Sequence, residues 1–212
     1  QAYYDALTGL VNRNQLEQGL DKSIAAALRS QKNFSVFFLD LDHFKQVNDN
    51  LGHDVGDELL KVVAERLKNS VRLTDIAARL GGDEFILVLN GIGTPDAAAG
   101  FAEKIMSVMS KPVVVRGHEL NIGISIGISF FPNDGTDYDT LIKSADLALY
   151  RSKELGRNNY QFCTPEMNHE ITDRIKFKTE LEAAIAANQL HLDYLPRQDL
   201  ESLQCFYKPW PH

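Results

Sequence analysis

The chain has 212 residues, of which 44% are hydrophobic, and its formal net charge is −7. This length and apolar content suffice for one well-packed domain with some chain to spare. The acidic balance argues against a general nucleic-acid or membrane-surface binder, and no apolar run reaches the roughly 20 residues that a membrane-spanning helix needs. Cys163 and Cys205 fit no metal-ligand spacing, so we expect reduced thiols in a cytoplasmic protein. Because the chain begins at Gln1, almost directly on a helix signal, we also expect a piece of a longer protein.

The first third of the chain alternates between helical and strand patterns. Apolar residues at i+4 spacing mark the first helix, and a nearly continuous apolar run marks a central strand covered on both faces. That strand ends in Asp40-Leu41-Asp42, whose two carboxylates should point to the same face. The predicted elements are a helix over 13–29, a strand over 34–39, a short helix through 47, a polar turn over 48–56 and a helix over 57–71.

A Gly-Gly turn lies at the centre of the pattern. Two strand-like runs, 76–78 and 85–89, flank Gly81-Gly82, which predicts a hairpin. Adjacent glycines take positive φ at little cost and let a ligand approach the backbone. Asp83 and Glu84 follow directly, so the turn presents two carboxylates beside open space, which suits a metal-bound, phosphate-bearing ligand. An ordinary hairpin with two solvated acids is the alternative.

The rest of the chain continues the alternation. Its predicted elements are a helix over 94–110, strands over 112–115, 119–131 and 159–162, and a helix over 138–155. We therefore expect an α/β (α+β) domain over residues 1–163, with a central, mostly antiparallel sheet of the kind that packs helices on one face. Beyond it we expect a linker helix over 164–189 and a strand-like start at 190–194.

Acidic residues gather in the two segments that should meet. If the hairpin pairs beside the first strand, up to four carboxylates converge at the strand ends, where ligands of open α/β sheets bind: Asp40, Asp42, Asp83 and Glu84. Such a cluster requires a cation, because each carboxylate raises the pKa of the others. Oxygen ligands prefer Mg²⁺ or Mn²⁺, and the scarcity of histidine and cysteine disfavours zinc. Carboxylate-held metals of this kind drive phosphoryl transfer.

Other residues suit a nucleotide, although no Gly-x-x-x-x-Gly-Lys-Ser/Thr loop occurs. The candidate phosphate ligands are Lys45, Lys153 and Arg157. Lys153 and Arg157 would alternatively favour only the negative end of their helix. Asn48 and Asp57 flank the polar turn, and a carboxylate can accept both donors of a guanine edge, which adenine lacks. That chemistry would select GTP over ATP. Helix capping is the alternative role of Asp57, and His53 is either a phosphate contact or structural.

At this point the chain resembles a known family, the GGDEF domains or diguanylate cyclases, over roughly residues 5–162. Gly81-Gly82-Asp83-Glu84-Phe85 is the family signature. The agreement extends to further spaced motifs: Asp5-x-Leu7-Thr8-Gly9-Leu10-x-Asn12-Arg13, Asp40-Leu41-Asp42-His43-Phe44-Lys45-x-x-Asn48-Asp49, Gly52-His53-x-x-Gly56-Asp57, Ala145-Asp146-x-Ala148-Leu149-Tyr150 and Lys153-x-x-Gly156-Arg157-Asn158.

The resemblance implies a Mg²⁺-dependent nucleotidyltransferase that joins two GTP into cyclic di-GMP and releases pyrophosphate, on a ferredoxin-like sheet of the nucleotidyl-cyclase palm type. The implied ligands of about two Mg²⁺ or Mn²⁺ ions per GTP are Asp40, the Leu41 carbonyl, Asp83 and Glu84. Asp83 is the implied general base on the ribose 3′-hydroxyl. The implied GTP contacts are Phe44, Lys45, Asn48, His53, Asp57, Gly81, Gly82, Lys153 and Arg157. Two domains must face each other, so a homodimer is expected.

Arg72-Leu73-Thr74-Asp75 stands at the spacing of the family's inhibitory Arg-x-x-Asp site, where a cyclic di-GMP dimer restrains the enzyme. The planar guanidinium fork suits guanine and phosphate, and Arg79 is expected to assist there. Taken alone, Arg72 and Asp75 would be an ordinary surface pair.

The end of the chain resembles the opening of an EAL phosphodiesterase domain, with Leu195 where that family usually has Gln. The Glu-Ala-Leu signature is missing, so we expect a truncated, poorly ordered start of that domain over 190–212. An upstream sensor and a downstream EAL domain are expected in the longer protein. Two alternatives stay open: a silent module that binds GTP or cyclic di-GMP and regulates an EAL domain, and a polymerase-palm-like or adenylyl-cyclase-like enzyme.

Overall fold

The computed structural model describes residues 3–164 and 167. Its elements in chain order are α1 (Arg13–Ser30), β1 (Phe34–Leu41), α2 (Phe44–Leu51), α3 (His53–Ser70), β2 (Ile76–Gly81), β3 (Glu84–Asn90), α4 (Pro95–Met109), β4 (Val113–Val115), β5 (His118–Leu120), β6 (Ile124–Phe131), α5 (Tyr138–Glu154) and β7 (Tyr160–Phe162). The first helix, the central strand, the Gly-Gly hairpin and the helices over 94–110 and 138–155 are confirmed within about two residues at each end.

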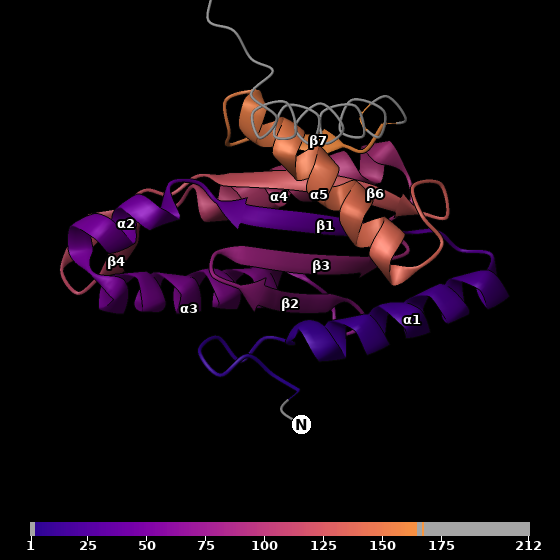
Figure 1. Ribbon diagram of the computed structural model, residues 1–212, viewed down its shortest axis with the longest axis horizontal. Coiled ribbons are helices and arrows are strands. Elements are labelled where there is room, and N and C mark those ends of the chain that lie inside the picture. Colours follow the sequence, from indigo (N-terminus) through magenta and orange to yellow (C-terminus); the bar gives the residue numbers. More distant parts are fainter. Residues whose placement is uncertain (1–2, 165–166, 168–212) are drawn as a thin grey trace, which may run out of the picture. The chain divides into compact units, whose positions relative to one another are not determined.

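Five strands form the main sheet, in the order β2-β3-β1-β6-β7 (Figure 1). The central strand β1 runs antiparallel to both β3 and β6, β2 runs antiparallel to β3, and only β7 is parallel to its neighbour. The expected central, mostly antiparallel sheet flanked by helices is therefore confirmed. Every residue of β1 is buried, which explains why its sequence is an almost unbroken apolar run.

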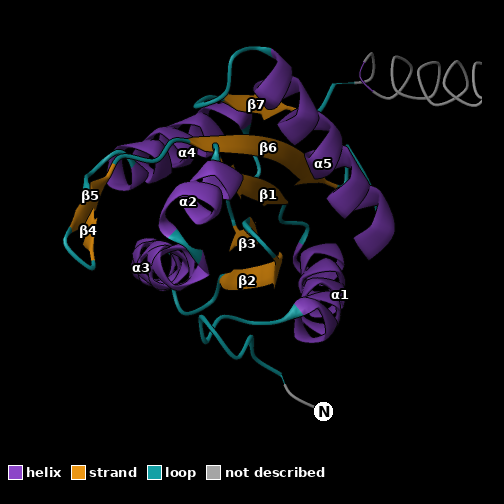
Figure 2. Ribbon diagram, turned by 60° about the vertical axis from the view of Figure 1, so that its left-hand side comes forward, coloured by secondary structure: helices purple, strands orange, loops and turns teal. Residues whose placement is uncertain are grey.

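Helices cover both faces of this sheet, not one face as expected (Figure 2). Because side chains alternate along β1, Phe37 and Leu39 pack with apolar residues of α3 and α4, whereas Val36 and Phe38 pack with those of α1 and α5. A strand that is apolar at consecutive positions exposes hydrophobic surface on two sides. Both sides must be covered by other elements. The expectation that helices pack on one face of the sheet was therefore wrong, because β1 is apolar on both faces.

Two further element predictions need correction. The expected strand over 119–131 is divided, because β5 pairs only with β4 in a separate two-stranded sheet and β6 begins at Ile124. The expected polar turn over 48–56 shrinks to Gly52, whose φ of 89° separates α2 from α3. Asp57 consequently lies inside α3, and helix capping does not explain it.

The predicted linker helix over 164–189, apart from Thr164 and Met167, and the predicted start of an EAL domain over 190–212 lie outside the described residues. Within the described part of the chain, no helix combines the length and the apolar character that crossing a bilayer demands.

Candidate active site

The hairpin brings acidic side chains to one end of the sheet. In the register of β1 and β3, Asp40 lies opposite Glu84, and side chains at opposite positions are neighbours. Asp83 occupies the turn before β3. Gly81 and Gly82 have φ values of 149° and 51°, and a Cβ at either position would have no other atom within 4 Å. The turn therefore has the open space and the positive φ values that the sequence predicted.

Charge at this end of the sheet is only partly compensated. Burial raises the pKa of Asp40, and the nearby Asp83 and Asp42 add to the shift, while Lys153 opposes it with Nζ 2.8 Å from Asp40 Oδ2. Burial also raises the pKa of Glu84, with further contributions from Asp146, Asp40 and Asp83. Carboxylates whose pKa is raised in this way are common where a protein binds cationic groups or catalyses reactions.

Up to four carboxylates were predicted to converge, and Asp83 lies close enough to Asp40 and Glu84 to raise the pKa of both. In residues 3–164 and 167, no group of three or more His, Cys, Asp or Glu side chains is arranged to hold a metal ion. Asp42 is buried and accepts hydrogen bonds from Ser125 Oγ at 2.7 Å and from the Asn158 backbone N–H at 2.9 Å. The Lys153 ammonium takes the position beside Asp40 that a cation would share. Asp40, Asp83 and Glu84 nevertheless offer the oxygen donors that Mg²⁺ or Mn²⁺ prefers.

The residues predicted to read guanine come together where α2 meets α3. Asn48 lies on α2, Asp57 is exposed on α3, and Gly56 lies against Asn48. A Cβ at Gly56 would lie 3.2 Å from Phe44 Cζ and far inside van der Waals contact with Asn48 Oδ1. Gly56 thus leaves the space that the Asn48 amide occupies, a role that sequence reasoning missed.

The predicted phosphate ligands come from separate segments: α2, the start of α3, the last turn of α5 and the turn that follows it. Lys45 lies on the first turn of α2 and is exposed, as is His53 at the start of α3. Lys153 lies in the last turn of α5, and Arg157 follows in an exposed turn with a φ of 63°.

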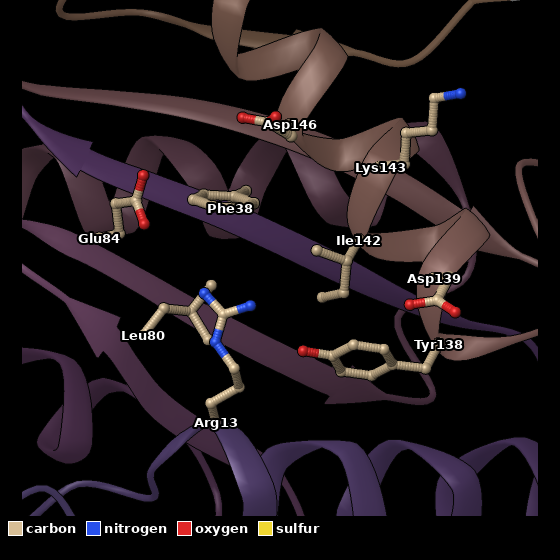
Figure 3. A pocket seen from close by; sticks show the side chains of 9 residues that line it. All are labelled: Arg13, Phe38, Leu80, Glu84, Tyr138, Asp139, Ile142, Lys143 and Asp146. Atoms are coloured by element: carbon tan, nitrogen blue, oxygen red, sulfur yellow. The ribbon is translucent and has the colours of Figure 1, made fainter.

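A cavity of about 360 Å³ lies beside Glu84 on the face covered by α1 and α5 (Figure 3). Phe38, Leu80 and Ile142 provide apolar walls, and the Asp146 carboxylate on α5 faces the same space as Glu84. The influence of Asp146 on Glu84 was missed from the sequence. The sequence did contain a signal for it. Asp146 and Lys153 are seven residues apart, which puts both on the same side of α5, so Asp146 could have been predicted to face the same end of the sheet as Lys153.

Comparison with known proteins settles the family. The sequence profile described as "Diguanylate cyclase, GGDEF domain" matches residues 2–159. The chain belongs to the GGDEF-domain family. It is similar to two Pseudomonas aeruginosa proteins: 42% identical to the bifunctional diguanylate cyclase/cyclic di-GMP phosphodiesterase MucR over 196 residues, and 40% identical to the cyclic di-GMP phosphodiesterase NbdA over 195. Each alignment covers 92% of this chain but only 28% and 25% of the respective relative, so the chain spans about a quarter of their length.

The fold agrees with solved GGDEF domains. In the crystal structure of the GGDEF domain of DgcB from Caulobacter crescentus in complex with c-di-GMP, the matched chain is 31% identical, with a TM-score of 0.71. The match covers 77% of this chain and 94% of that chain.

The GGDEF turn is attached to the N-terminal segment through Arg79. Its Nη1 lies 2.9 Å from Asp5 Oδ1, and its Nε and Nη2 donate to the Gly82 carbonyl at 3.0 and 2.8 Å. Burial alone would raise the pKa of Asp5, but hydrogen bonds from Thr8 and Arg79 outweigh it and hold that pKa below its usual value. Arg79 was expected to assist the Arg72–Asp75 site, and that role stays a prediction. Its guanidinium contacts in this structure join the GGDEF turn to Asp5.

Arg72 and Asp75 of this GGDEF domain line a second cavity, of about 160 Å³, together with Phe101 and Lys104 from α4. Asp75 accepts hydrogen bonds from the backbone N–H of Arg72 at 2.9 Å and from that of Asn90 at 3.0 Å. The two carboxylate oxygens therefore hold the loop before β2 against the end of β3, and the Arg72 side chain is exposed at the rim.

Proposed function

We propose that this GGDEF domain is a diguanylate cyclase that condenses two GTP into cyclic di-GMP and pyrophosphate. The observation that carries the proposal is the cross-strand pairing of Asp40 with Glu84, next to Asp83 on an open glycine turn. Carboxylates that are held close together repel one another and oppose folding, and divalent cations bound together with a nucleotide would offset that cost.

Each group of residues has a distinct role in this proposal. Asn48 and Asp57 bind the guanine edge, with the Asp57 carboxylate accepting from N1–H and the 2-amine. Lys45, Lys153 and Arg157 bind phosphate oxygens, and Phe44, His53, Gly81 and Gly82 complete the GTP contacts. Asp40, the Leu41 carbonyl, Asp83 and Glu84 would hold Mg²⁺ or Mn²⁺, which when bound neutralises phosphate charge.

Asp83 accepts the proton of a ribose 3′-hydroxyl. The 3′-oxygen then bonds to the α-phosphorus of the other GTP, and the bond to pyrophosphate breaks. Because each domain binds one GTP, the reaction needs two domains related by a two-fold axis. Positioning and charge stabilisation supply the catalysis. Inhibition by the product is assigned to the cavity beside Arg72 and Asp75, and the cyclic di-GMP complex of the DgcB domain supports a product-binding role for this family.

The test is incubation of the chain with GTP and Mg²⁺ over a concentration series, followed by chromatography for cyclic di-GMP. We expect turnover per domain to rise with protein concentration. Asp83→Ala should abolish product, whereas Asp21→Ala, an exposed aspartate on α1, should leave it unchanged. Folded wild-type chain that binds GTP but forms no product at any concentration would refute the cyclase proposal.

That outcome would favour a second function, a module that binds GTP or cyclic di-GMP and regulates an attached EAL phosphodiesterase domain. The similarity to NbdA, whose name records only a phosphodiesterase, supports this alternative. Calorimetry with GTP and with cyclic di-GMP on the same protein distinguishes the two functions, because the regulatory module binds without turnover.

A further inference from the structure

We propose that Asp42 is a positioning residue: it fixes the turn that carries Arg157 relative to Asp40 and thereby sets the affinity for the triphosphate. The inference rests on the proposed GTP site, but its structural part can be tested without nucleotide. It also replaces the expectation that Asp42 joins a metal-binding cluster.

The Asp42 carboxylate accepts hydrogen bonds from two residues that lie far away in the sequence. It is 5% exposed, and its Oδ1 accepts from Ser125 Oγ on β6 while its Oδ2 accepts from the backbone N–H of Asn158. The backbone N–H of Asp42 donates to the Gly123 carbonyl at 2.9 Å. A Cβ at Gly123 would lie 2.8 Å from Asp42 Oδ2, so glycine at that position leaves space for the carboxylate.

The turn that Asp42 contacts has an unfavourable backbone conformation. Gly156, Arg157 and Asn158 have φ values of 107°, 63° and 45°. Left-handed conformations are unfavourable for non-glycine residues, less so for asparagine than for arginine, so two such residues in succession benefit from hydrogen bonds to other segments. A carboxylate acceptor forms a stronger hydrogen bond to a backbone N–H than a neutral acceptor does. Asp42 supplies this support at Asn158, directly after Arg157.

The contact joins the two halves of the proposed site. Ser152 and Asn159 tie the base of the turn to the end of α5, through Ser152 Oγ on the Asn159 carbonyl and Asn159 Nδ2 on the Ser152 carbonyl. Asp42 ties the tip of the turn to the end of β1, the strand that carries Asp40. Loss of Asp42 would remove the contact between the tip of the turn and the end of β1. The Arg157 backbone would keep only its bonds to the end of α5 and to the base of the turn, where its N–H donates to the Ser152 carbonyl at 3.2 Å and its carbonyl accepts from Asn159 Nδ2 at 2.9 Å. Arg157 would then be less firmly positioned relative to the carboxylates, while the guanine contacts on α2 and α3 stay in place.

The experiment compares Asp42→Ala with Asp42→Asn in the full chain, by amide hydrogen exchange and by calorimetric titration with GTP and GMP. The asparagine amide can keep both contacts, because its oxygen accepts from Asn158 and its NH₂ donates to the Ser125 hydroxyl. We expect Asp42→Ala to accelerate exchange at the Asn158 amide and to weaken GTP about tenfold. GMP binding should be unchanged, and Asp42→Asn should stay close to wild type.

Matched variants sharpen the result. Arg157→Ala should weaken GTP binding as much as Asp42→Ala does. The double variant should bind GTP no more weakly than either single variant. Ser125→Ala, which leaves the Asn158 contact, should bind GTP normally. If Asp42→Ala does not fold, Gly123→Ala displaces the same carboxylate and should show the same two effects. Three results would overturn the proposal. Exchange at the Asn158 amide could be unchanged in Asp42→Ala, or Asp42→Asn could bind GTP as weakly as Asp42→Ala. The third is that Asp42→Ala weakens GTP and GMP binding equally. Wild type that binds no GTP would count against the proposed function, and the exchange result would still decide the role of Asp42.

Discussion

Gly56→Ala tests whether the space beside Asn48 sets guanine affinity. The added methyl group would overlap the Asn48 amide and lie 3.2 Å from the edge of the Phe44 ring, because α2 and α3 pack closely at this glycine. Gly100 on α4 is the control, since it is also helical but is exposed, and a Cβ there would have no other atom within 4 Å.

The two substitutions should differ in their effect on the free energy of unfolding. Alanine in a helix interior is favoured over glycine by about 0.5–1 kcal/mol, so Gly100→Ala should stabilise the fold by that amount. At Gly56 the same gain is opposed by overpacking of about 1–3 kcal/mol, so the free energy of unfolding should be unchanged or fall by up to about 2.5 kcal/mol. Displacing Asn48 should also remove its proposed hydrogen bond to guanine, worth about 0.5–1.5 kcal/mol, and so raise KM for GTP about two- to tenfold.

The assay is steady-state kinetics with GTP, together with urea denaturation to measure the free energy of unfolding. KM should rise more than kcat falls, because the lost contact lies on the base and not at the reacting atoms. On an Asn48→Ala background, where the overlapping amide is gone, Gly56→Ala should add almost nothing. A KM equal to that of wild type, or a full additive effect on the Asn48→Ala background, would refute this role of Gly56.

Three further predictions follow from the site. Burial and Asp146 raise the pKa of Glu84, so its ionisation opposes folding. Glu84→Gln should raise Tm fully above the pKa of Glu84 in the folded chain, and the gain should vanish as the pH falls below the pKa of Glu84 in the unfolded chain. Asp5→Ala should cost about 1.5–3 kcal/mol of unfolding free energy in urea, by loss of its charged contact with Arg79. Because the pKa of Asp5 is lowered, this contribution should be complete above the usual aspartate pKa and be lost as the pH falls through the folded value, and a pH-independent difference would contradict the assignment. Arg72→Ala should leave the initial rate of product formation intact and reduce inhibition by added cyclic di-GMP, so unchanged inhibition would exclude the Arg72 cavity as the inhibitory site.

Much of the fold followed from local patterns in the sequence. The apolar run over 34–39 became β1, the paired glycines became the hairpin between β2 and β3, and Asn12 caps α1 by accepting from the Gln15 backbone N–H at 3.1 Å. These features depend on residues within a few positions of one another, so the chain order already contains the relevant neighbours. The boundary between α2 and α3 was less predictable, because one glycine ends the first helix where a longer polar stretch indicated a loop.

By itself, the sequence determined the family, the antiparallel sheet and the identity of the candidate GTP residues. Only the tertiary structure decided which partner each charged side chain has: Lys153 with Asp40, Arg79 with Asp5, and Asp42 with Ser125 and Asn158. It also showed that helices cover both sheet faces and that Gly56 makes room for Asn48. The reason is that these contacts join segments up to 116 positions apart, and periodicity along a strand or helix specifies the face of a residue but not its partner across the fold.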